Sequence, residues 1–249
     1  MTFDRGIVYI ATDEMLYFAM TLMSIQSFRR AGNNEPIAVI TNIPGELWTG
    51  RHDLNYTLVP ADQTPLRGLR GSYYHRSTLL EKSPYFRTLL VDSDILFVNS
   101  INEIWEGNED LSVAIDPCET IKIVRAAAPR WGSQESWDEN IRLVGENGAH
   151  YNVGVLRIDR SPNGVAFFQA WKEEINRFTC PDVDQAAFIR AVHRSDIPLK
   201  LMDQRFNSAY RVFHPCQERC LAPAIVHFNG MGKEKRNQEM LSVFQKHFG

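Results

Sequence analysis

The stretch LLVDSDILFV, Leu89–Val98, places two aspartates, Asp92 and Asp94, between two apolar runs. Apolar runs of this kind are typical of buried strands, and a carboxylate next to them loses hydration. Such carboxylates are stabilised by a bound cation or by hydrogen bonds. The stretch therefore predicts a buried strand that ends at a pair of acidic side chains, and our hypothesis is that these side chains hold a divalent metal ion.

The composition is that of a globular protein with a slightly acidic balance. The 249 residues are 44% hydrophobic and 23% charged, and the formal net charge is −3. A chain of this length can bury one large core, as one domain or as two fused halves. Proteins that mainly bind nucleic acid usually carry a basic surface, so we expect no nucleic-acid partner and instead a small molecule.

The N-terminal segment and the cysteines indicate the compartment. The apolar run near the N-terminus is too short for a signal peptide, and no later segment approaches the length of a membrane span. We therefore expect a cytoplasmic protein. Cys216 and Cys220 with His214 lack a fourth ligand at zinc-site spacing, and the four cysteines are too scattered for a disulfide framework, so we expect reduced thiols.

Strand and helix signals alternate along the chain. Apolar runs typical of strands cover residues 7–11, 36–41, 56–59, 87–91, 111–115, 151–158, 199–202 and 224–228. Helical patterns cover residues 13–32, 73–82, 161–178, 182–192 and 234–248, and a short helix is expected near residues 102–105. Strands separated by helices imply an α/β protein with a parallel sheet and right-handed crossovers.

Polar residues follow two of these strands at their carboxyl ends. Thr12 and Asp13 follow the first strand, and Asp92 and Asp94 follow the strand of residues 87–91. Ligands of such sheets bind beyond the carboxyl ends of the strands, so we expect these side chains to face one crevice. For Thr12 and Asp13 alone, a helix cap is an equally good interpretation.

The segment from residue 119 to residue 149 shows the least regular pattern. It contains a proline, three glycines and two tryptophans, Trp131 and Trp137, that we expect to be exposed. Long irregular segments in compact domains are usually functional, so the segment is a candidate lid or acceptor platform. In the strand that follows, Gly154 predicts a close approach of the backbone to another group.

The residue types around the aspartates suit phosphate chemistry. Hard divalent cations favour oxygen ligands, and a histidine nitrogen at His227 suits Mn²⁺ better than Mg²⁺. Gly230 and Gly232 let the backbone approach phosphate oxygens, and Lys233 adds a positive charge. Taken singly, each has a plainer explanation: a solvated turn at the aspartates, a partly buried histidine, and a surface turn with a solvated lysine.

Five ordered motifs resemble those of the family 8 glycosyltransferases of the GT-A fold. They are the D-S-D core of residues 86–105, the basic Arg76 before it, the Y-N-V-G-V strand of residues 151–155, the D-Q pair of residues 184–185, and H-F-x-G-x-x-K at residues 227–233. The resemblance implies an α/β GT-A nucleotide-diphospho-sugar transferase fold, a single Rossmann-like domain with a mixed, mainly parallel sheet. Within the domain of residues 1–249, residues 1–105 would form the nucleotide-binding half and residues 106–249 the half for donor sugar and acceptor.

The resemblance also implies roles for individual residues. Asp92, Asp94 and His227 would bind Mn²⁺, with Mg²⁺ as a second possibility, and the ion would bridge the diphosphate of a UDP-sugar. The residues that would contact the donor are Ala11, Thr12, Asp13, Arg76, Ser93, Asp116, Asn152, Gly154, Gly230 and Lys233. Gln185 would lie beneath the anomeric carbon, and Asp184 would contact the sugar or act as an alternative nucleophile.

Three positions depart from the family pattern. Val153 replaces the usual serine or alanine, Arg76 replaces the common lysine, and no Pro-Trp pair follows Lys233.

The implied reaction is transfer of a hexose from a UDP-sugar to a glycan, a lipid-linked acceptor or a protein. The family pattern implies retention of the anomeric configuration, and glutamine is a poor nucleophile, which favours front-side attack. A haloacid dehalogenase-type phosphatase and a non-catalytic nucleotide-sugar binding protein are the alternatives. In such phosphatases the D-x-D motif belongs to the first strand, whereas here it follows about ninety residues of α/β sequence.

The C-terminal helix offers a possible contact with a membrane surface. Its basic residues flank apolar ones, a pattern found in helices that lie on anionic membranes. These residues are Lys233, Lys235, Arg236, Leu241, Phe244, Lys246 and Phe248. Packing of the apolar residues on the protein's own core is the favoured interpretation.

Overall fold

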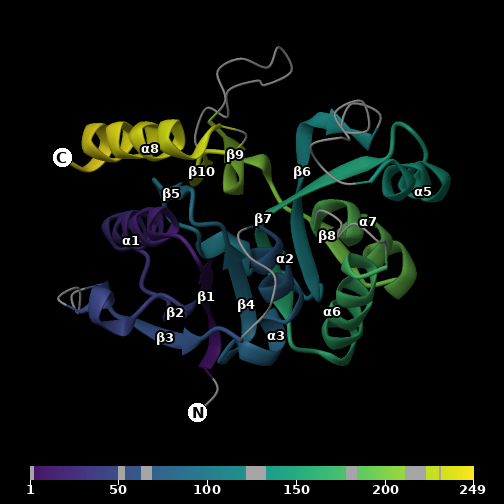
Figure 1. Cartoon of the computed structure of the whole chain (residues 1–249), viewed down its shortest axis with the longest axis horizontal. Coiled ribbons are helices and arrows are strands. Elements are labelled where there is room, and N and C mark those ends of the chain that lie inside the picture. Colours follow the sequence, from purple (N-terminus) through teal and green to yellow (C-terminus); the bar gives the residue numbers. More distant parts are fainter. Residues whose placement is uncertain are drawn as a thin grey trace.

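A seven-stranded sheet forms the centre of the molecule (Figure 1). The computed structural model describes residues 3–49, 54–62, 69–121, 133–177, 184–210, 223–229 and 231–249. In order across the sheet, the strands are β3 (Tyr56–Pro60), β2 (Ile37–Thr41), β1 (Phe3–Ala11), β4 (Tyr85–Val91), β7 (Ala149–Asp159), β6 (Leu111–Thr120) and β8 (Leu199–Leu201). Strand β7 runs antiparallel to both neighbours, and the other pairs are parallel. The predicted mixed, mainly parallel sheet is confirmed.

Helices cover both faces of this sheet (Figure 1). The α-helices are α1 (Met15–Arg30), α2 (Leu69–Ser77), α3 (Leu79–Lys82), α5 (Gln134–Val144), α6 (Pro162–Ile175), α7 (Asp184–Ser195) and α8 (Lys233–Phe248), and the 3₁₀ helices are η1 (Gly45–Trp48), η3 (Asn102–Trp105) and η5 (Gln204–Phe206). Side chains alternate between faces along a strand. On β1, Tyr9 packs in the core that includes Phe28 of α1, and Val8 packs in the core that includes Trp171 of α6.

A second, three-stranded sheet lies beside the first and is central to the candidate site. It consists of β5 (Ile95–Phe97), β10 (Ile225–His227) and β9 (Ser208–Ala209). Strand β5 follows Asp94 directly, and its antiparallel pairing with β10 sets His227 opposite Ile95. Residues separated by more than 130 positions therefore meet at the carboxyl end of β4.

The helix boundaries show where local sequence signals decide structure. Ser161 caps α6, because its side chain accepts a hydrogen bond from the Gly164 backbone N–H at 3.0 Å. Helix α1 begins at Met15, and its N-cap Glu14 makes no side-chain capping bond, so neither Thr12 nor Asp13 acts as the helix cap. Gly32 follows this helix with φ +80°, the conformation that favours glycine.

Three expectations about local structure are wrong. The helix expected at residues 73–82 is two helices that meet at Thr78, and the first begins at Leu69. Strand β6 runs to Thr120, so Asp116 lies inside a strand and not at its end. Trp137 is fully buried, because α5 folds over the sheet edge and packs this ring against Ala186 and Ile189 of α7.

Helix α8 packs on the molecule through its apolar side. Met240 and Phe244 join a core cluster with Met20 of α1, and Phe248 packs against it, while Leu241 stays 44% exposed. The favoured interpretation, that the apolar residues of this helix pack on the protein's own core, agrees with these contacts. The packing gives no support to membrane contact. Within the described ranges, no helix has the length and apolar character needed to cross a membrane.

Candidate active site

Two aspartates and a histidine converge at the carboxyl end of β4. His227 Nε2 lies 3.6 Å from Asp92 Oδ2 and 3.4 Å from Asp94 Oδ1. One ligand atom from each residue falls within 4.8 Å of the other two. Asp94 and His227 are buried, and Asp92 is partly open to solvent.

Backbone hydrogen bonds fix the loop that carries the aspartates. The Asp92 backbone N–H donates to the Gly154 carbonyl of β7 at 2.9 Å, and the Phe228 N–H donates to the Asp94 carbonyl at 2.9 Å. A Cβ atom at Gly154 would lie 2.3 Å from His227 Cε1 and 2.9 Å from Asp92 Oδ2. The close backbone approach predicted for Gly154 is therefore present, and it is made to the acidic cluster itself.

Asn207 orients the His227 ring. Its Oδ1 lies 2.9 Å from His227 Nδ1, and its Nδ2 donates to the Asn152 carbonyl at 3.1 Å. Since the amide oxygen can only accept, Nδ1 carries a hydrogen, and Nε2 is the ring nitrogen that faces the aspartates. Histidines that ligate metals are commonly fixed in this way by a second hydrogen bond.

Two arginines hold the outer oxygens of the aspartates. Arg76 donates to Asp92 Oδ1, and Arg236 Nη1 lies 2.7 Å from Asp94 Oδ2. The inner oxygens, Asp92 Oδ2 and Asp94 Oδ1, face His227. Burial raises the pKa of Asp94, but His227 and Arg236 outweigh it and hold the pKa well below its usual range. Asp94 is thus ionised at neutral pH.

This donor set fits a divalent cation. Ligands about 2.1 Å from one ion and at right angles lie roughly 3.0 Å apart. His227 Nε2 lies 3.6 and 3.4 Å from the inner oxygens of Asp92 and Asp94. Carboxylate oxygens suit hard divalent cations such as Mg²⁺ and Mn²⁺, and an imidazole nitrogen suits transition-metal ions. The absence of a side chain at Gly154 leaves the donors free to converge.

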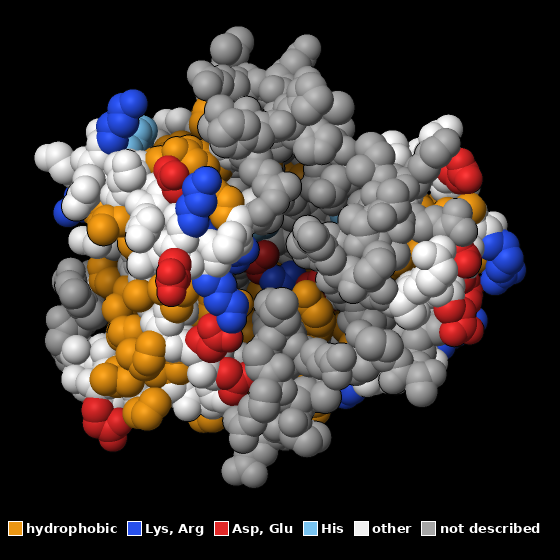
Figure 2. All heavy atoms as spheres, turned by 45° about the horizontal axis from the view of Figure 1, so that its top comes forward, with side chains coloured by type: hydrophobic (Ala, Val, Ile, Leu, Met, Phe, Trp, Pro, Cys, Tyr) orange, Lys and Arg blue, Asp and Glu red, His pale blue; other side chains and the backbone are white. Residues whose placement is uncertain are grey.

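The three residues lie beside an open cleft. Figure 2 shows acidic and basic side chains at the bottom of a hollow on this face of the molecule. The lining residues are Ile10, Thr12, Tyr17, Tyr73, Arg76, Leu90, Val91, Asp92, Ser93, Asp94 and Arg236. The carboxyl ends of β1 and β4 therefore open into one crevice, as the strand pattern predicts.

Three residues that were expected to contact the donor, Asp13, Ser93 and Ala11, make contacts within the protein instead. Asp13 has φ +68° and forms two hydrogen bonds with Asn42, each 2.8 Å long. Ser93 is buried and accepts a hydrogen bond from Thr21 of α1 at 2.9 Å, so it fixes the loop between the aspartates. Ala11 is fully buried in the core and does not line the cleft.

Asn152 and Lys233 lie at the margins of the site. Asn152 is buried, and its Oδ1 accepts from the Gly154 N–H at 3.0 Å. Lys233, the first residue of α8, pairs with Glu14 at 2.5 Å and lies over the Tyr17 ring at 5.5 Å from its centroid. Lys233 thus connects α8 to the turn after β1.

Asp184 and Gln185 begin α7, and Arg76 connects Asp184 to Asp92. Arg76 links the two sites, because its Nη1 donates to Asp184 Oδ2 at 2.7 Å while its Nη2 holds Asp92. Asp184 Oδ1 accepts the Gln185 backbone N–H at 2.9 Å. Burial raises the pKa of Asp184 above its usual value, although Arg76 acts in the opposite direction.

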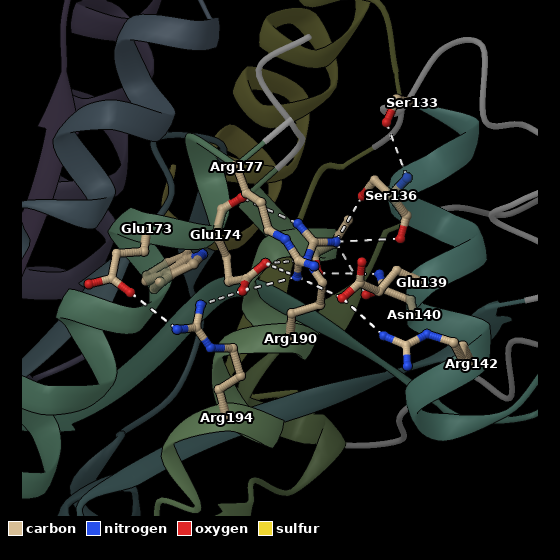
Figure 3. Close-up of polar contacts among 12 residues, drawn as sticks. Ser133, Ser136, Glu139, Asn140, Arg142, Glu173, Glu174, Arg177, Arg190 and Arg194 are labelled. Carbon is tan, nitrogen blue, oxygen red and sulfur yellow. Dashed lines mark hydrogen bonds and ion pairs between the residues drawn. The ribbon is translucent and has the colours of Figure 1, made fainter. Parts of the chain in front are cut away.

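A buried ionic network positions α7 (Figure 3). Arg190 of α7 and Glu174 of α6 are both fully buried and pair at 2.6 Å, and Arg194 adds a second bond to Glu174 at 2.6 Å. Arg190 also donates to Ser136 Oγ of α5 at 2.8 Å. The network joins three helices at one point, and α7 carries Asp184 at its first residue.

Some predicted residues lie outside what the structure describes. These are the side chain of Asp116, the whole of Gly230, and the group of His214, Cys216 and Cys220.

Four residues of the site were not predicted from the sequence. The sequence contains a signal for two of them. Arg236 lies three positions after the candidate Lys233, and Tyr17 lies four positions after the candidate Asp13, so each is about one helical turn from a candidate residue. Tyr73 and Asn207 carried no local signal.

Fold and site together define a glycosyltransferase of the GT-A type. The model of a family described as nucleotide-diphospho-sugar transferase matches residues 86–240, more than half of the chain. The chain therefore belongs to the nucleotide-diphospho-sugar transferase family, as the resemblance to family 8 enzymes implied. This membership decides against the phosphatase alternative.

Solved structures support the fold. The galactosyltransferase LgtC, solved with donor and acceptor sugar analogs, is 18% identical, with 95% of each chain covered and a TM-score of 0.63. Mouse xyloside xylosyltransferase 1 is 11% identical, with 91% of this chain and 98% of that one covered and a TM-score of 0.57. The glycosyltransferase GlyE of Streptococcus pneumoniae is 15% identical, with 98% and 64% covered and a TM-score of 0.59. No curated protein sequence matches the chain.

Proposed function

We propose that the protein transfers a hexose from a UDP-sugar to a carbohydrate or glycoconjugate acceptor in a Mn²⁺-dependent reaction. The observation that carries this proposal is the convergence of Asp92, Asp94 and His227 in the cleft, with Arg76 connecting them to Asp184. When bound to these three ligands, Mn²⁺ supplies Lewis-acid stabilisation for the charge that develops on the departing UDP. Mg²⁺ is the second candidate.

The chain's own residues would bind and orient the donor. Thr12 and Tyr17 line the cleft on the side of β1 and α1, and they would contact the uridine. Arg76 and Lys233 supply positive charge for the diphosphate, because charge-assisted bonds to phosphate oxygens are stronger than neutral ones. Each of these cations pairs with a carboxylate in the structure, so donor binding exchanges one anionic partner for another.

Retention of the anomeric configuration by front-side attack is the stereochemical part of the proposal. Both carboxylate oxygens of Asp184 already accept hydrogen bonds, one from Arg76 and one from Gln185. A carboxylate held in this way is a poor nucleophile, which favours attack by the acceptor hydroxyl beside the leaving group, with a donor phosphate oxygen taking its proton. Gln185 would then contact the sugar without bonding to it covalently.

The proposal is tested by measuring UDP release from a panel of UDP-sugars with and without Mn²⁺. We expect metal-dependent release from one donor and a loss of about 100-fold or more in Asp94→Asn. Asp196→Asn is the matched control, since Asp196 is exposed at the far end of α7 and has φ +47°, which asparagine tolerates. Absence of release from every donor contradicts a catalytic function, and binding of a UDP-sugar without release indicates the non-catalytic alternative.

The stereochemistry has its own test. We expect NMR of the product formed from an α-linked UDP-sugar to show an α-linked glycoside. A β-linked product would contradict retention and leave the transferase assignment intact.

A further inference from the structure

Arg236 is a cationic residue of the cleft that lies outside the family motif. It follows Lys233 by three positions on the first turn of α8, so the two side chains share one side of the helix. Arg236 lines the cleft together with Thr12, Tyr17 and the aspartates. Its side chain is 18% exposed, so most of its length is enclosed.

The contacts of Arg236 leave part of its hydrogen-bonding capacity unused. Nη1 lies 2.7 Å from Asp94 Oδ2, and Nη2 donates to the Met231 carbonyl at 2.9 Å. Nε is buried and has no hydrogen-bond acceptor among the residues that the structure describes. A buried N–H of a guanidinium without an acceptor points to a ligand that supplies one.

Arg236 differs from the other two cations near the site in the partner that holds it. Arg76 bridges two carboxylates, Asp92 and Asp184, and Lys233 contacts both oxygens of Glu14. Arg236 has a single carboxylate contact within the described ranges, to an oxygen of a proposed metal ligand. A divalent cation that compensates the charge of Asp94 would repel the nearby guanidinium and weaken this contact.

We propose that Arg236 is a further binding residue for the donor diphosphate, held on Asp94 until metal and nucleotide bind. The planar guanidinium offers paired donors that match phosphate oxygens, and Nε supplies one of them. The inference rests on the proposed function, because it takes a nucleoside diphosphate as the ligand of the cleft. It assigns Arg236 two successive partners, the Asp94 carboxylate and then a phosphate.

This exchange predicts that loss of Arg236 weakens binding of UDP but does not weaken binding of Mn²⁺ alone. Replacing Arg236 with a neutral residue removes a contact to the diphosphate, which weakens binding of UDP in the presence of Mn²⁺. The same replacement removes a cation that competes for Asp94, so Mn²⁺ alone should bind as tightly as before or several-fold more tightly. A residue that only positions Asp94 would weaken both ligands together.

Calorimetric titration of the 249-residue chain with UDP at saturating Mn²⁺, and spectroscopic titration with Mn²⁺ alone, test the inference. For Arg236→Gln we expect UDP affinity to fall by about 10-fold or more, with uridine affinity unchanged because uridine carries no phosphate. Lys235→Gln is the matched control, since it removes the same charge from an exposed position of the same helix turn. Arg236→Lys keeps the charge without the paired donors and should give an intermediate loss.

The contradicting outcomes are distinct. Unchanged UDP affinity in Arg236→Gln, or weakening of Mn²⁺ alone together with UDP, overturns the role of Arg236. Failure of the wild-type protein to bind UDP in the presence of Mn²⁺ contradicts the proposed function, and with it this inference. Thermal unfolding of each variant checks that the fold is kept.

Discussion

Gly154 is the residue whose lack of a side chain makes room for the candidate metal site. Its missing side chain leaves room for His227 and Asp92, since a Cβ atom would lie 2.3 Å from the imidazole carbon Cε1 and 2.9 Å from Asp92 Oδ2. Contacts this short force the donors apart. The glycine is therefore a requirement of the cluster.

Substituting Gly154 with alanine should weaken the metal site. We expect Gly154→Ala to lower Mn²⁺ affinity by about 10-fold or more, because the added methyl group displaces the His227 ring. Titration with Mn²⁺, monitored by the signal of the free ion, measures the effect. Gly45→Ala serves as control, since nothing lies within 4 Å of the position of its Cβ. Equal Mn²⁺ affinity in the two variants would contradict the assignment.

Asn207 offers a second test at this scale. Its Oδ1 fixes the His227 tautomer, and such outer partners commonly contribute 10–100-fold to metal affinity. We therefore expect Asn207→Ala to bind Mn²⁺ about 10-fold more weakly. Asn237→Ala, at a half-buried position of α8, is the comparison. A normal Mn²⁺ affinity in Asn207→Ala would show that the ring orientation does not depend on this amide.

At the scale of elements, the ionic network holds α7 in place. Glu174 and Arg190 are fully buried, and a buried charge without its partner is strongly unfavourable. Because the network also binds α5 through Ser136, it couples α7 to a helix that the sequence pattern suggested only as part of an irregular segment. The position of Asp184 and Gln185 thus depends on contacts more than one turn away.

Removing one member of the Glu174–Arg190 pair should lower the free energy of unfolding more than removing both. We expect Arg190→Met to lower the free energy of unfolding by about 3–5 kcal/mol, because Glu174 stays buried and loses its fully buried partner. The double variant Glu174→Met with Arg190→Met should recover part of this loss. Urea denaturation measures both, with Arg142→Met as control, since that side chain is 71% exposed. Additive losses would contradict a coupled pair.

The elements themselves were largely predictable, and the contacts between them were not. Strand β4 and the cap at Ser161 follow from local patterns, and both are present. The pairing of β5 with β10, which brings His227 to Asp94, joins segments far apart in sequence and has no local signal. Trp137 was expected to be exposed because its neighbours looked irregular, and only the packing of α5 on α7 buries it.

At the scale of the whole molecule, buried histidine links stability to pH. Burial lowers the pKa of His150 from 6.5 to about 4. The unfolded chain takes up a proton as the pH falls below 6.5, whereas the folded protein does so only near pH 4. The contribution of a neutral His150 is therefore complete above pH 6.5 and is lost progressively as the pH falls to 4.

This linkage predicts acid sensitivity of the fold. We expect the free energy of unfolding to decrease by on the order of 3 kcal/mol between pH 7 and pH 4 through His150 alone. Urea denaturation at several pH values measures the slope. His150→Gln cannot take up this proton, so its slope should be smaller over the same range. Parallel slopes for the two proteins would exclude His150 as the source.

Those residues of the site that belong to the family's ordered motifs could be predicted from the sequence. The sequence placed Asp92, Asp94, His227, Arg76 and Asp184 together through a family resemblance, and the structure brings these five into contact. Arg236 and Asn207 depend on the three-dimensional arrangement of α8 and of the segment before β9. Asp116 was placed at a strand end, but β6 continues past it.

The central claim is that Asp92, Asp94 and His227 hold one divalent ion against a nucleoside diphosphate. Anomalous diffraction from crystals grown with Mn²⁺ and UDP tests this directly. The proposal predicts one strong Mn²⁺ peak about 2.1–2.3 Å from a donor atom of each of the three residues, with UDP phosphate oxygens among its remaining ligands. A Mn²⁺ peak elsewhere, or UDP bound in the cleft with no Mn²⁺ at these residues, would contradict it.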